Sequence, residues 1–289
     1  MPAIGRIREI WRYPVKGMAG ESVDACVLLN NGLTGDRHWA VRDELRNEVQ
    51  SCKTRPALLQ CRARYPRPPD GSAISPVEVT FPDGAIIGSD NPEINARLSA
   101  LNGRASTLQS LRPASDVAFY RRYKTDDHTW RDELAATFER AAGEPLPDLD
   151  QLPPVLVDCV AVPGTLFLVT PLHVITTATL DALERLRPES DWDLRRFRPN
   201  VVIETDPRFA GLVEQQWVER RLRIGNATVA CVSATPRCGA ITRAQRGLAF
   251  DSSMLRTVVQ HAAQNAGIYA VVENGAELKV GDAVSLIDS

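Results

Sequence analysis

The sequence lacks the motifs that mark several large enzyme classes. It has no Gly-x-Ser-x-Gly elbow, no phosphate loop with Gly-Lys-Ser/Thr and no Gly-x-Gly-x-x-Gly fingerprint. Its six cysteines show no paired spacing of the zinc or iron–sulfur type, and its four histidines are scattered. The familiar hydrolase, nucleotide-binding and histidine–zinc chemistries are therefore not indicated.

The chain also lacks a strong charge bias and the segments that direct a protein to a membrane. Its formal net charge is −2, which gives no argument for nucleic acid or an anionic membrane as a partner. Residues 1–15 contain no apolar core of a secretion signal. Residues 159–180 have no charged side chain, but Pro163, Gly164 and Pro171 break them into short pieces typical of core strands. We expect no membrane span, reduced and mostly structural thiols, and a cytoplasmic location.

The pattern that is present predicts a mixed α/β, strand-rich fold. The length of 289 residues is enough for two domains, and the apolar fraction of 44% is that of a globular protein. β-branched and alternating segments predict strands at residues 4–11, 22–29, 35–41, 201–204, 227–232, 269–272 and 283–287. Helical spacing and capping residues predict helices at residues 92–102, 129–142, 177–187 and 252–265. Barrel-like pieces are consistent with this composition.

One cysteine stands out by its position. Cys238 follows the strand at residues 227–232 in a loop that Pro236 and Gly239 force out of the sheet. Arg237 gives the thiol a cationic neighbour, which favours the thiolate, a nucleophile or soft metal ligand. The competing interpretation is a small apolar side chain that fills a gap.

Basic residues recur where predicted strands begin or end. They are Lys16, Arg37, Arg198 and Arg237, and Arg198 stands close to Asn200. Fork-shaped donors beside an amide suit an anionic ligand rich in phosphate and heteroatoms. A soft metal held by one cysteine and an organic cofactor would use this set, although composition alone does not favour that hypothesis.

Five short motifs occur in a recognisable order. They are Tyr13-Pro14-Val15-Lys16, Gly35-Asp36-Arg37, Phe197-Arg198-Pro199-Asn200, Arg237-Cys238 and Lys279-Val280-Gly281-Asp282. Together they resemble the MOSC family, in the branch with an N-terminal β-barrel domain that includes the mitochondrial amidoxime-reducing component. The resemblance covers nearly the whole chain. It implies an N-terminal β-barrel domain at residues 1–128, whose first strand can pack on the second domain, and a MOSC domain at residues 140–287.

The resemblance also implies a cofactor and its ligands. Members of the family bind the molybdenum cofactor, a pyranopterin whose dithiolene holds the metal. By resemblance, Cys238 is the thiolate ligand to molybdenum and the catalytic residue. The implied cofactor-binding residues are Lys16, Gly17, Arg37, Thr170, Arg198, Asn200, Arg237 and Tyr269. Gly17 stands where relatives commonly carry serine, and Lys53 where they often carry arginine, so a hydroxyl and a guanidinium fork are missing.

The implied activity is the reduction of N-hydroxylated or N-oxide small molecules by a molybdenum oxidoreductase. Because the chain has no cluster-type cysteines, the electrons are expected from a separate protein of the ferredoxin, flavodoxin or cytochrome type with its reductase. One alternative is a sulfur carrier or cofactor-holding module without redox turnover. Another is a barrel-like binder with merely structural thiols.

Overall fold

The computed structural model describes residues 3–71, 73–123 and 130–287. Its strands are β1 Ala3–Arg12, β2 Glu21–Val23, β3 Ala25–Leu29, β4 Gly32–Leu33, β5 Trp39–Asp43, β6 Glu48–Val49, β7 Arg62–Arg64, β8 Glu78–Thr80, β9 Ile86–Gly88, β10 Ser106–Ser110, β11 Leu172–Thr176, β12 Val201–Thr205, β13 Arg221–Ile224, β14 Ala227–Pro236, β15 Asn265–Asn274, β16 Glu277–Lys279 and β17 Ala283–Ile287. Its α-helices are α1 Ile94–Asn102, α2 Val117–Tyr120, α3 Trp130–Ala136, α4 Thr177–Leu186 and α5 Ser253–His261. The class is mixed α/β and strand-rich, as the sequence predicts.

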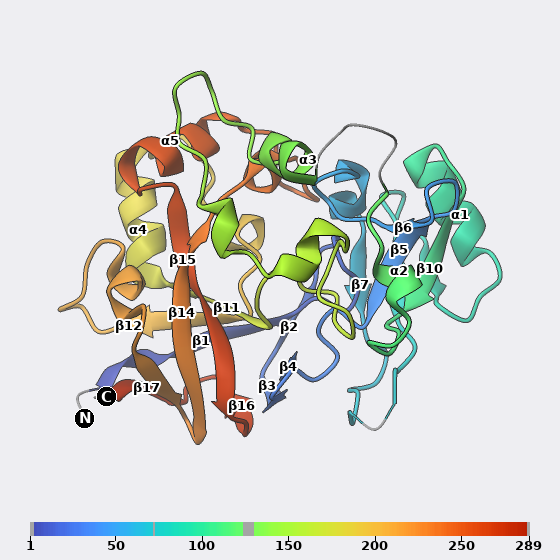
Figure 1. Cartoon of the computed structure of the whole chain (residues 1–289). Helices are drawn as coiled ribbons and strands as arrows, with labels where there is room; N and C mark the ends of the chain where they lie inside the picture. The colour runs from blue at the N-terminus through green and yellow to red at the C-terminus, as the bar shows by residue number, and fades with distance from the viewer. Residues whose placement is uncertain (1–2, 72, 124–129, 288–289) are drawn as a thin grey trace.

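A closed barrel organises the larger part of the molecule. Seven strands follow one another in the order β12-β11-β15-β14-β13-β17-β1, and β1 pairs back onto β12 to close the ring. All these pairings are antiparallel except β11 with β12. The first strand of the chain therefore completes a barrel whose other strands come from the C-terminal half (Figure 1).

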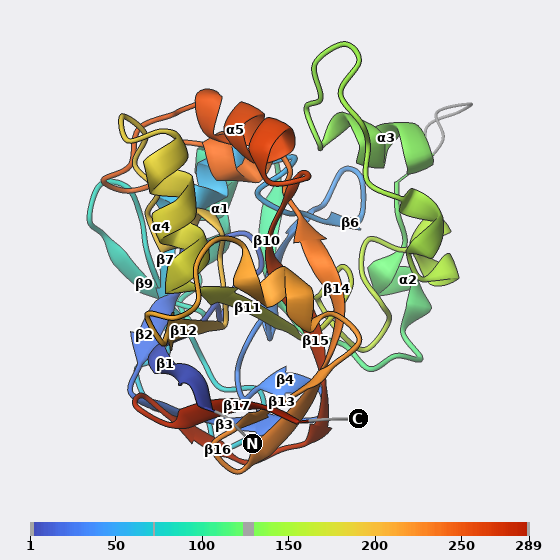
Figure 2. The ribbon, with the colours of Figure 1, turned by 90° about the vertical axis from the view of Figure 1, so that its left-hand side faces the viewer.

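Alternation along the strands separates two hydrophobic cores. Val174 of β11 and Val201 of β12 point into the barrel and belong to its inner core, whereas Ile175 and Val202 belong to a second core outside it. The helices α4 and α5 cover this outer side, where Leu183 and Val258 pack (Figure 2). A period of two along a strand produces this inside–outside division.

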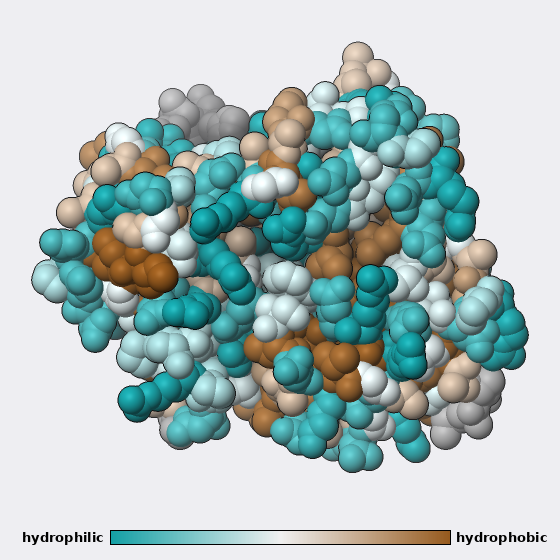
Figure 3. All heavy atoms as spheres, turned by 180° about the vertical axis from the view of Figure 1, so that it is seen from behind, coloured by the Kyte–Doolittle hydropathy of each residue, from teal (hydrophilic) through white to brown (hydrophobic). Residues whose placement is uncertain are grey.

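The residues between β1 and the barrel's C-terminal strands form smaller sheets. One has the order β10-β5-β6, another β7-β8-β9, and α1 packs beside β10. A third, β16-β3-β4, joins residues 25–33 to the C-terminal strand β16. Seen from behind, most of the surface is hydrophilic, with apolar residues gathered in separate patches (Figure 3).

The element boundaries differ from the prediction in several places. The predicted helix at 252–265 ends at His261, because Asn265 already begins β15 and pairs with Pro236. The predicted helix at 129–142 ends at Ala136 in the structure, and its expected first residue, Thr129, lies outside the described residues. The predicted strand at 22–29 is divided at Asp24 into β2 and β3.

The ends of α1 and α4 are formed in different ways. The side chain of Thr176 accepts a hydrogen bond from the Thr179 amide and caps α4. Pro92 precedes α1, which begins at Ile94, while Gly103 closes that helix in the left-handed conformation. Across the described ranges, no helix has the length and apolar character needed to cross a membrane.

Candidate functional site

The predicted site residues meet in one cavity of about 230 Å³, called here the cofactor cavity. Lys16, Gly17 and Arg37 come from the N-terminal segments, and the others come from the barrel and its connecting loops. All nine side chains or backbones predicted from the sequence line it: Lys16, Gly17, Arg37, Thr170, Arg198, Asn200, Arg237, Cys238 and Tyr269. Six basic residues line the cavity against one acidic residue, Asp148, so it is strongly cationic.

Two of the site arginines have an unusual backbone conformation. The φ angles are +53° at Arg37 and +57° at Arg198. A side chain in this left-handed region costs about 1 kcal/mol. Such strain is characteristic of positions where the surrounding structure fixes a functional side chain.

Both arginines are held against Tyr13. The guanidinium carbon of Arg198 lies 4.3 Å from the centroid of the Tyr13 ring, and that of Arg37 lies 5.4 Å from it. Arg198 also donates to the Met18 carbonyl oxygen over 2.6 Å, whereas Arg37 forms an ion pair with Asp36. Burial is the main cause that lowers the pKa of Arg198. A bound anion would relieve this cost.

Arg237 is buried and retains an unused donor. Its Nη2 donates to the Phe197 carbonyl oxygen over 2.7 Å, and its Nη1 lies 3.4 Å from Nε2 of His173. Burial lowers the pKa of the guanidinium, and the side chains of Tyr269 and Cys238 counteract this effect. Its Nε atom has no hydrogen-bond partner among the described residues. A buried unpaired donor costs free energy, and a ligand that places an acceptor at this atom would remove that cost.

Lys16 lies at the boundary between the two halves of the chain. Its Nζ donates to the Leu166 carbonyl oxygen over 2.7 Å. Burial, followed by the charges of Arg37 and Lys53, lowers the pKa of Lys16 to about 7. When the cavity holds no ligand, the Lys16 amine can therefore gain or lose a proton near neutral pH.

Gly17 brings two backbone segments into close approach. Its φ angle is +85°, and a Cβ placed on it would lie 2.8 Å from the Cys52 amide nitrogen. A serine here would carry conformational strain and press on this segment. The local backbone therefore accounts for glycine at this position of the cavity wall.

Cys238 is partly exposed and lies two residues after β14, which ends at Pro236. It precedes the short 3₁₀ turn Gly239–Thr242. The thiol lines the cationic cavity and also borders an apolar cluster that contains Leu134, Phe138 and Leu149. Its remaining side faces the cavity in which the arginines and Lys16 lie.

The three other predicted residues have less direct roles in the described structure. The side chain of Asn200 accepts from the His173 amide over 3.2 Å and donates to the Trp11 carbonyl oxygen over 3.3 Å, so it mainly fastens strand ends. Thr170 donates to the Leu172 carbonyl oxygen over 3.2 Å. Tyr269 meets the ring of His173 edge-on, with centroids 6.0 Å apart.

His173 is a cavity residue that was not among the site residues predicted from the sequence. The ring lines the cavity, and burial lowers its pKa to about 3. Its Nδ1 lies 3.4 Å from the Arg198 carbonyl oxygen, which can only accept, so a neutral ring with the proton on Nδ1 leaves Nε2 to accept from Arg237. Its position among apolar residues of β11 gave no sequence signal for this contact.

The donor set fits an anionic cofactor that brings most of its own metal ligands. Within the described ranges, no three His, Cys, Asp or Glu side chains converge to hold a metal ion. A metal at Cys238 would therefore depend on an organic ligand, for which the cavity offers cationic groups and the free Arg237 Nε. The residues present are compatible with a pterin–dithiolene metal cofactor.

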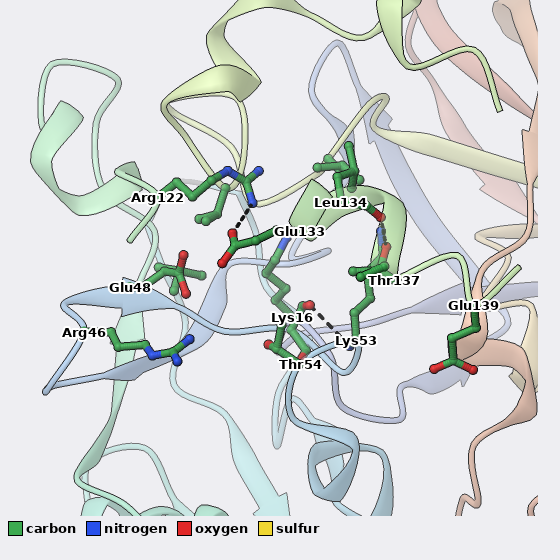
Figure 4. A pocket seen from close by; sticks show the side chains of 15 residues that line it. Lys16, Arg46, Glu48, Lys53, Thr54, Arg122, Glu133, Leu134, Thr137 and Glu139 are labelled. Atoms are coloured by element: carbon green, nitrogen blue, oxygen red, sulfur yellow. Dashed lines mark hydrogen bonds and ion pairs between the residues drawn. The ribbon is translucent and has the colours of Figure 1, made fainter. Parts of the chain in front are cut away.

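A second cavity, called here the side chamber, adjoins the first and measures about 370 Å³. The two cavities share Lys16, Ser51, Lys53, Leu134 and Leu168. Figure 4 shows the side chamber, with Arg122 reaching towards Glu133 of α3 and Glu48 nearby on another wall.

Two family models match successive parts of the chain. The MOSC N-terminal beta barrel domain matches residues 4–108, and the MOSC domain matches residues 166–285. The chain is 28% identical to mitochondrial amidoxime reducing component 2 of Bos taurus, over 97% of this chain and 83% of that protein.

Comparison with solved structures gives weaker similarities. The YuaD protein of Bacillus subtilis is 11% identical, with a TM-score of 0.44 over 98% of this chain and 94% of that one. YiiM from Escherichia coli is 14% identical, with a TM-score of 0.31 over 41% of this chain and 55% of that one. Both scores are below 0.5, so the assignment rests on the sequence matches. With both domains present in this order, the chain belongs to the MOSC family, among the members that carry a MOSC N-terminal beta barrel domain.

Proposed function

We propose that this protein is a molybdenum-cofactor oxidoreductase that reduces N-hydroxylated or N-oxide small molecules. The proposal is supported by its family and by its distant similarity to a protein named as an amidoxime reducing component. The observation that carries it is the placement of the partly exposed Cys238 in a cavity lined by six basic residues.

Each residue has a distinct part in holding the cofactor. Cys238 would provide the protein's thiolate ligand to molybdenum, and Arg37, Arg198 and Lys16 would bind the anionic groups of the pterin. Arg237 would donate from its free Nε, and Gly17, beside which the Cys52 segment packs closely, would form part of the cavity wall. Thr170, Asn200 and Tyr269 would complete the wall. When bound, the cofactor supplies two-electron redox chemistry at its metal.

The chain's own residues supply charge and protons. Cleavage of an N–O bond to an amine-type product and water consumes two electrons and two protons. The buried arginines keep the cavity positive and hold anionic groups in fixed orientations. Lys16, whose pKa is lowered to about 7 by burial, can hold or release a proton at Nζ on the wall shared with the side chamber.

The proposal includes a separate electron-donor protein of the ferredoxin, flavodoxin or cytochrome type and a cytoplasmic location. All six cysteines are free, and five of them are buried, which suits a reducing compartment.

Metal analysis of protein made in a host that synthesises the cofactor tests the proposal. We expect about one molybdenum per chain, since one thiolate ligand is available. The holoprotein should reduce benzamidoxime to benzamidine with an artificial electron donor. A persulfide on Cys238 without molybdenum, detected by mass spectrometry, would instead indicate a sulfur carrier.

A further inference from the structure

The side chamber has the size of a small-molecule site and shares part of its wall with the cofactor cavity. Its volume of about 370 Å³ lies within the range usual for ligand pockets. Five residues belong to the walls of both cavities, so the chamber lies directly beside the cavity that Cys238 lines. Part of its lining is apolar: Val49, Leu134, Ala136, Val160 and Leu168.

Most charged groups of the chamber already have partners. Arg122 lies 3.7 Å from Glu133 and also donates to the Leu156 carbonyl oxygen over 3.3 Å. Glu139 forms an ion pair with Arg243. The charges of these groups are therefore balanced within the protein, and Nε of Arg122 has no described partner.

Two further cations of the chamber lie over aromatic rings. The guanidinium carbon of Arg46 is 5.0 Å from the Tyr123 ring centroid, and Nζ of Lys53 is 5.7 Å from that of Phe138. Both side chains are more exposed than Glu48 and can be solvated. They therefore do not require an anion in the chamber.

Glu48 differs from the other charged groups. Its residue is only 8% exposed, and its carboxylate accepts from the Tyr123 amide over 2.9 Å and from Gln50 Nε2 over 3.1 Å. It forms no ion pair with any described residue. Burial is the main cause that raises the pKa of Glu48, with a contribution from the neighbouring Glu133, while its hydrogen bonds and the charge of Arg122 act in the opposite direction. A buried carboxylate whose hydrogen-bond donors in the described ranges are neutral gains from a bound cation.

We propose that the side chamber binds the tail of the substrate and that Glu48 selects tails that carry an ammonium or amidinium group on a compact apolar frame. The apolar wall would contact the frame, while the N–O group would extend across the shared wall towards the cofactor cavity. This inference rests on the proposed function, because it assigns a substrate class to the same site.

Binding of two small probes to the holoprotein tests the selectivity without turnover. Benzylamine is a cation at pH 7, and benzyl alcohol is a neutral molecule of nearly the same shape. Calorimetry should show benzylamine binding about tenfold more tightly, the scale of one charge-assisted hydrogen bond. Glu48→Gln should bring the ratio close to one. Glu78→Gln is the matched control, since Glu78 pairs with Arg64 on β7 and does not line the chamber.

A second variant locates the binding site independently of Glu48. Ala136 of α3 is exposed and lines the chamber, so Ala136→Phe should fill it and weaken benzylamine binding about tenfold. Equal affinities for the two probes in the unaltered protein would overturn the proposal, as would a preference that survives both Glu48→Gln and Ala136→Phe.

Turnover separates this proposal from the one on which it rests. 4-(Aminomethyl)benzamidoxime should have a KM about tenfold below that of 4-(hydroxymethyl)benzamidoxime. Reduction of both compounds with equal KM would refute the side-chamber proposal alone. Absence of reduction, with the probe preference intact, would refute the reductase proposal while the chamber's cation selectivity stands.

Discussion

Nε2 of His173 lies 3.4 Å from Nη1 of Arg237, on the wall of the cofactor cavity. The same guanidinium donates through Nη2 to the Phe197 carbonyl oxygen, so two of its nitrogens are fixed by the protein. The third, Nε, remains without a described partner. The neutral imidazole therefore helps to orient the Arg237 side chain, whose Nε donor is left for a ligand.

His173→Leu should weaken cofactor retention, because Arg237 loses an acceptor that fixes its orientation. The expected effect is about tenfold in cofactor affinity, the lower end of the range for residues that orient ligand-holding groups. Molybdenum per chain after extended dialysis measures it. His173→Gln keeps an acceptor and should recover part of the loss. Equal molybdenum retention in His173→Leu and the unaltered protein would contradict a positioning role.

Gly267→Ala should destabilise the fold, because β15 passes directly beside the His173 ring. A Cβ on Gly267, where φ is +84°, would lie 2.3 Å from His173 Nε2 and 2.7 Å from the Val174 carbonyl oxygen. Gly84 is a matched control, with φ at +89° and no atom within 4 Å of its added Cβ. In urea denaturation, Gly267→Ala should lose about 2 kcal/mol more than Gly84→Ala. Equal losses of unfolding free energy in the two variants would show that β15 can move away from the His173 ring without cost.

Lys16 predicts a specific pH dependence of stability in the cofactor-free protein. Burial lowers the pKa of Lys16 to about 7 in the folded state, from an ordinary value of 10.5. Between these values the unfolded chain binds the proton and the folded chain does not, so the free energy of unfolding rises with pH. Below about pH 7 both states are protonated, and the slope disappears.

Comparison with Lys16→Met isolates this effect. The stability of the unaltered protein relative to the variant should rise by at most about 1.4 kcal/mol per pH unit from pH 7 to 9. Denaturation curves at pH 6, 7, 8 and 9 provide the measurement. A stability difference between the two proteins that does not change over this pH range would mean that the Lys16 amine keeps its ordinary pKa.

Much of the site could be predicted because each motif places a basic or thiol side chain at a turn or at the end of a strand. Arg37 follows the turn glycine Gly35, and Arg198 stands just before the strand β12, where the chain adopts left-handed backbone. Cys238 was identified by the Pro236 and Gly239 that end its strand. The convergence of these positions on one cavity came from resemblance to a family, not from their spacing. The roles assigned to individual residues remain predictions.

The features of the fold and the site that the sequence did not predict depend on contacts between segments that are distant in the chain. His173 faces Tyr269 only because β11 and β15 pair in that register, and a single histidine in an apolar strand gives no sign of it. The pairing of β1 with β12 and β17 likewise joins residues at opposite ends of the chain. The end of α5 at His261 reflects the start of β15, which overrides helical spacing towards Asn265.

Molybdenum content of matched Cys238→Ala and Cys231→Ala proteins, made in the same cofactor-competent host, tests the central claim most directly. Cys231 is a buried thiol of the barrel core on the same strand and serves as the control. The protein and Cys231→Ala should hold about one molybdenum per chain, and Cys238→Ala should hold little and fail to reduce benzamidoxime. Full molybdenum content and turnover in Cys238→Ala would contradict the account.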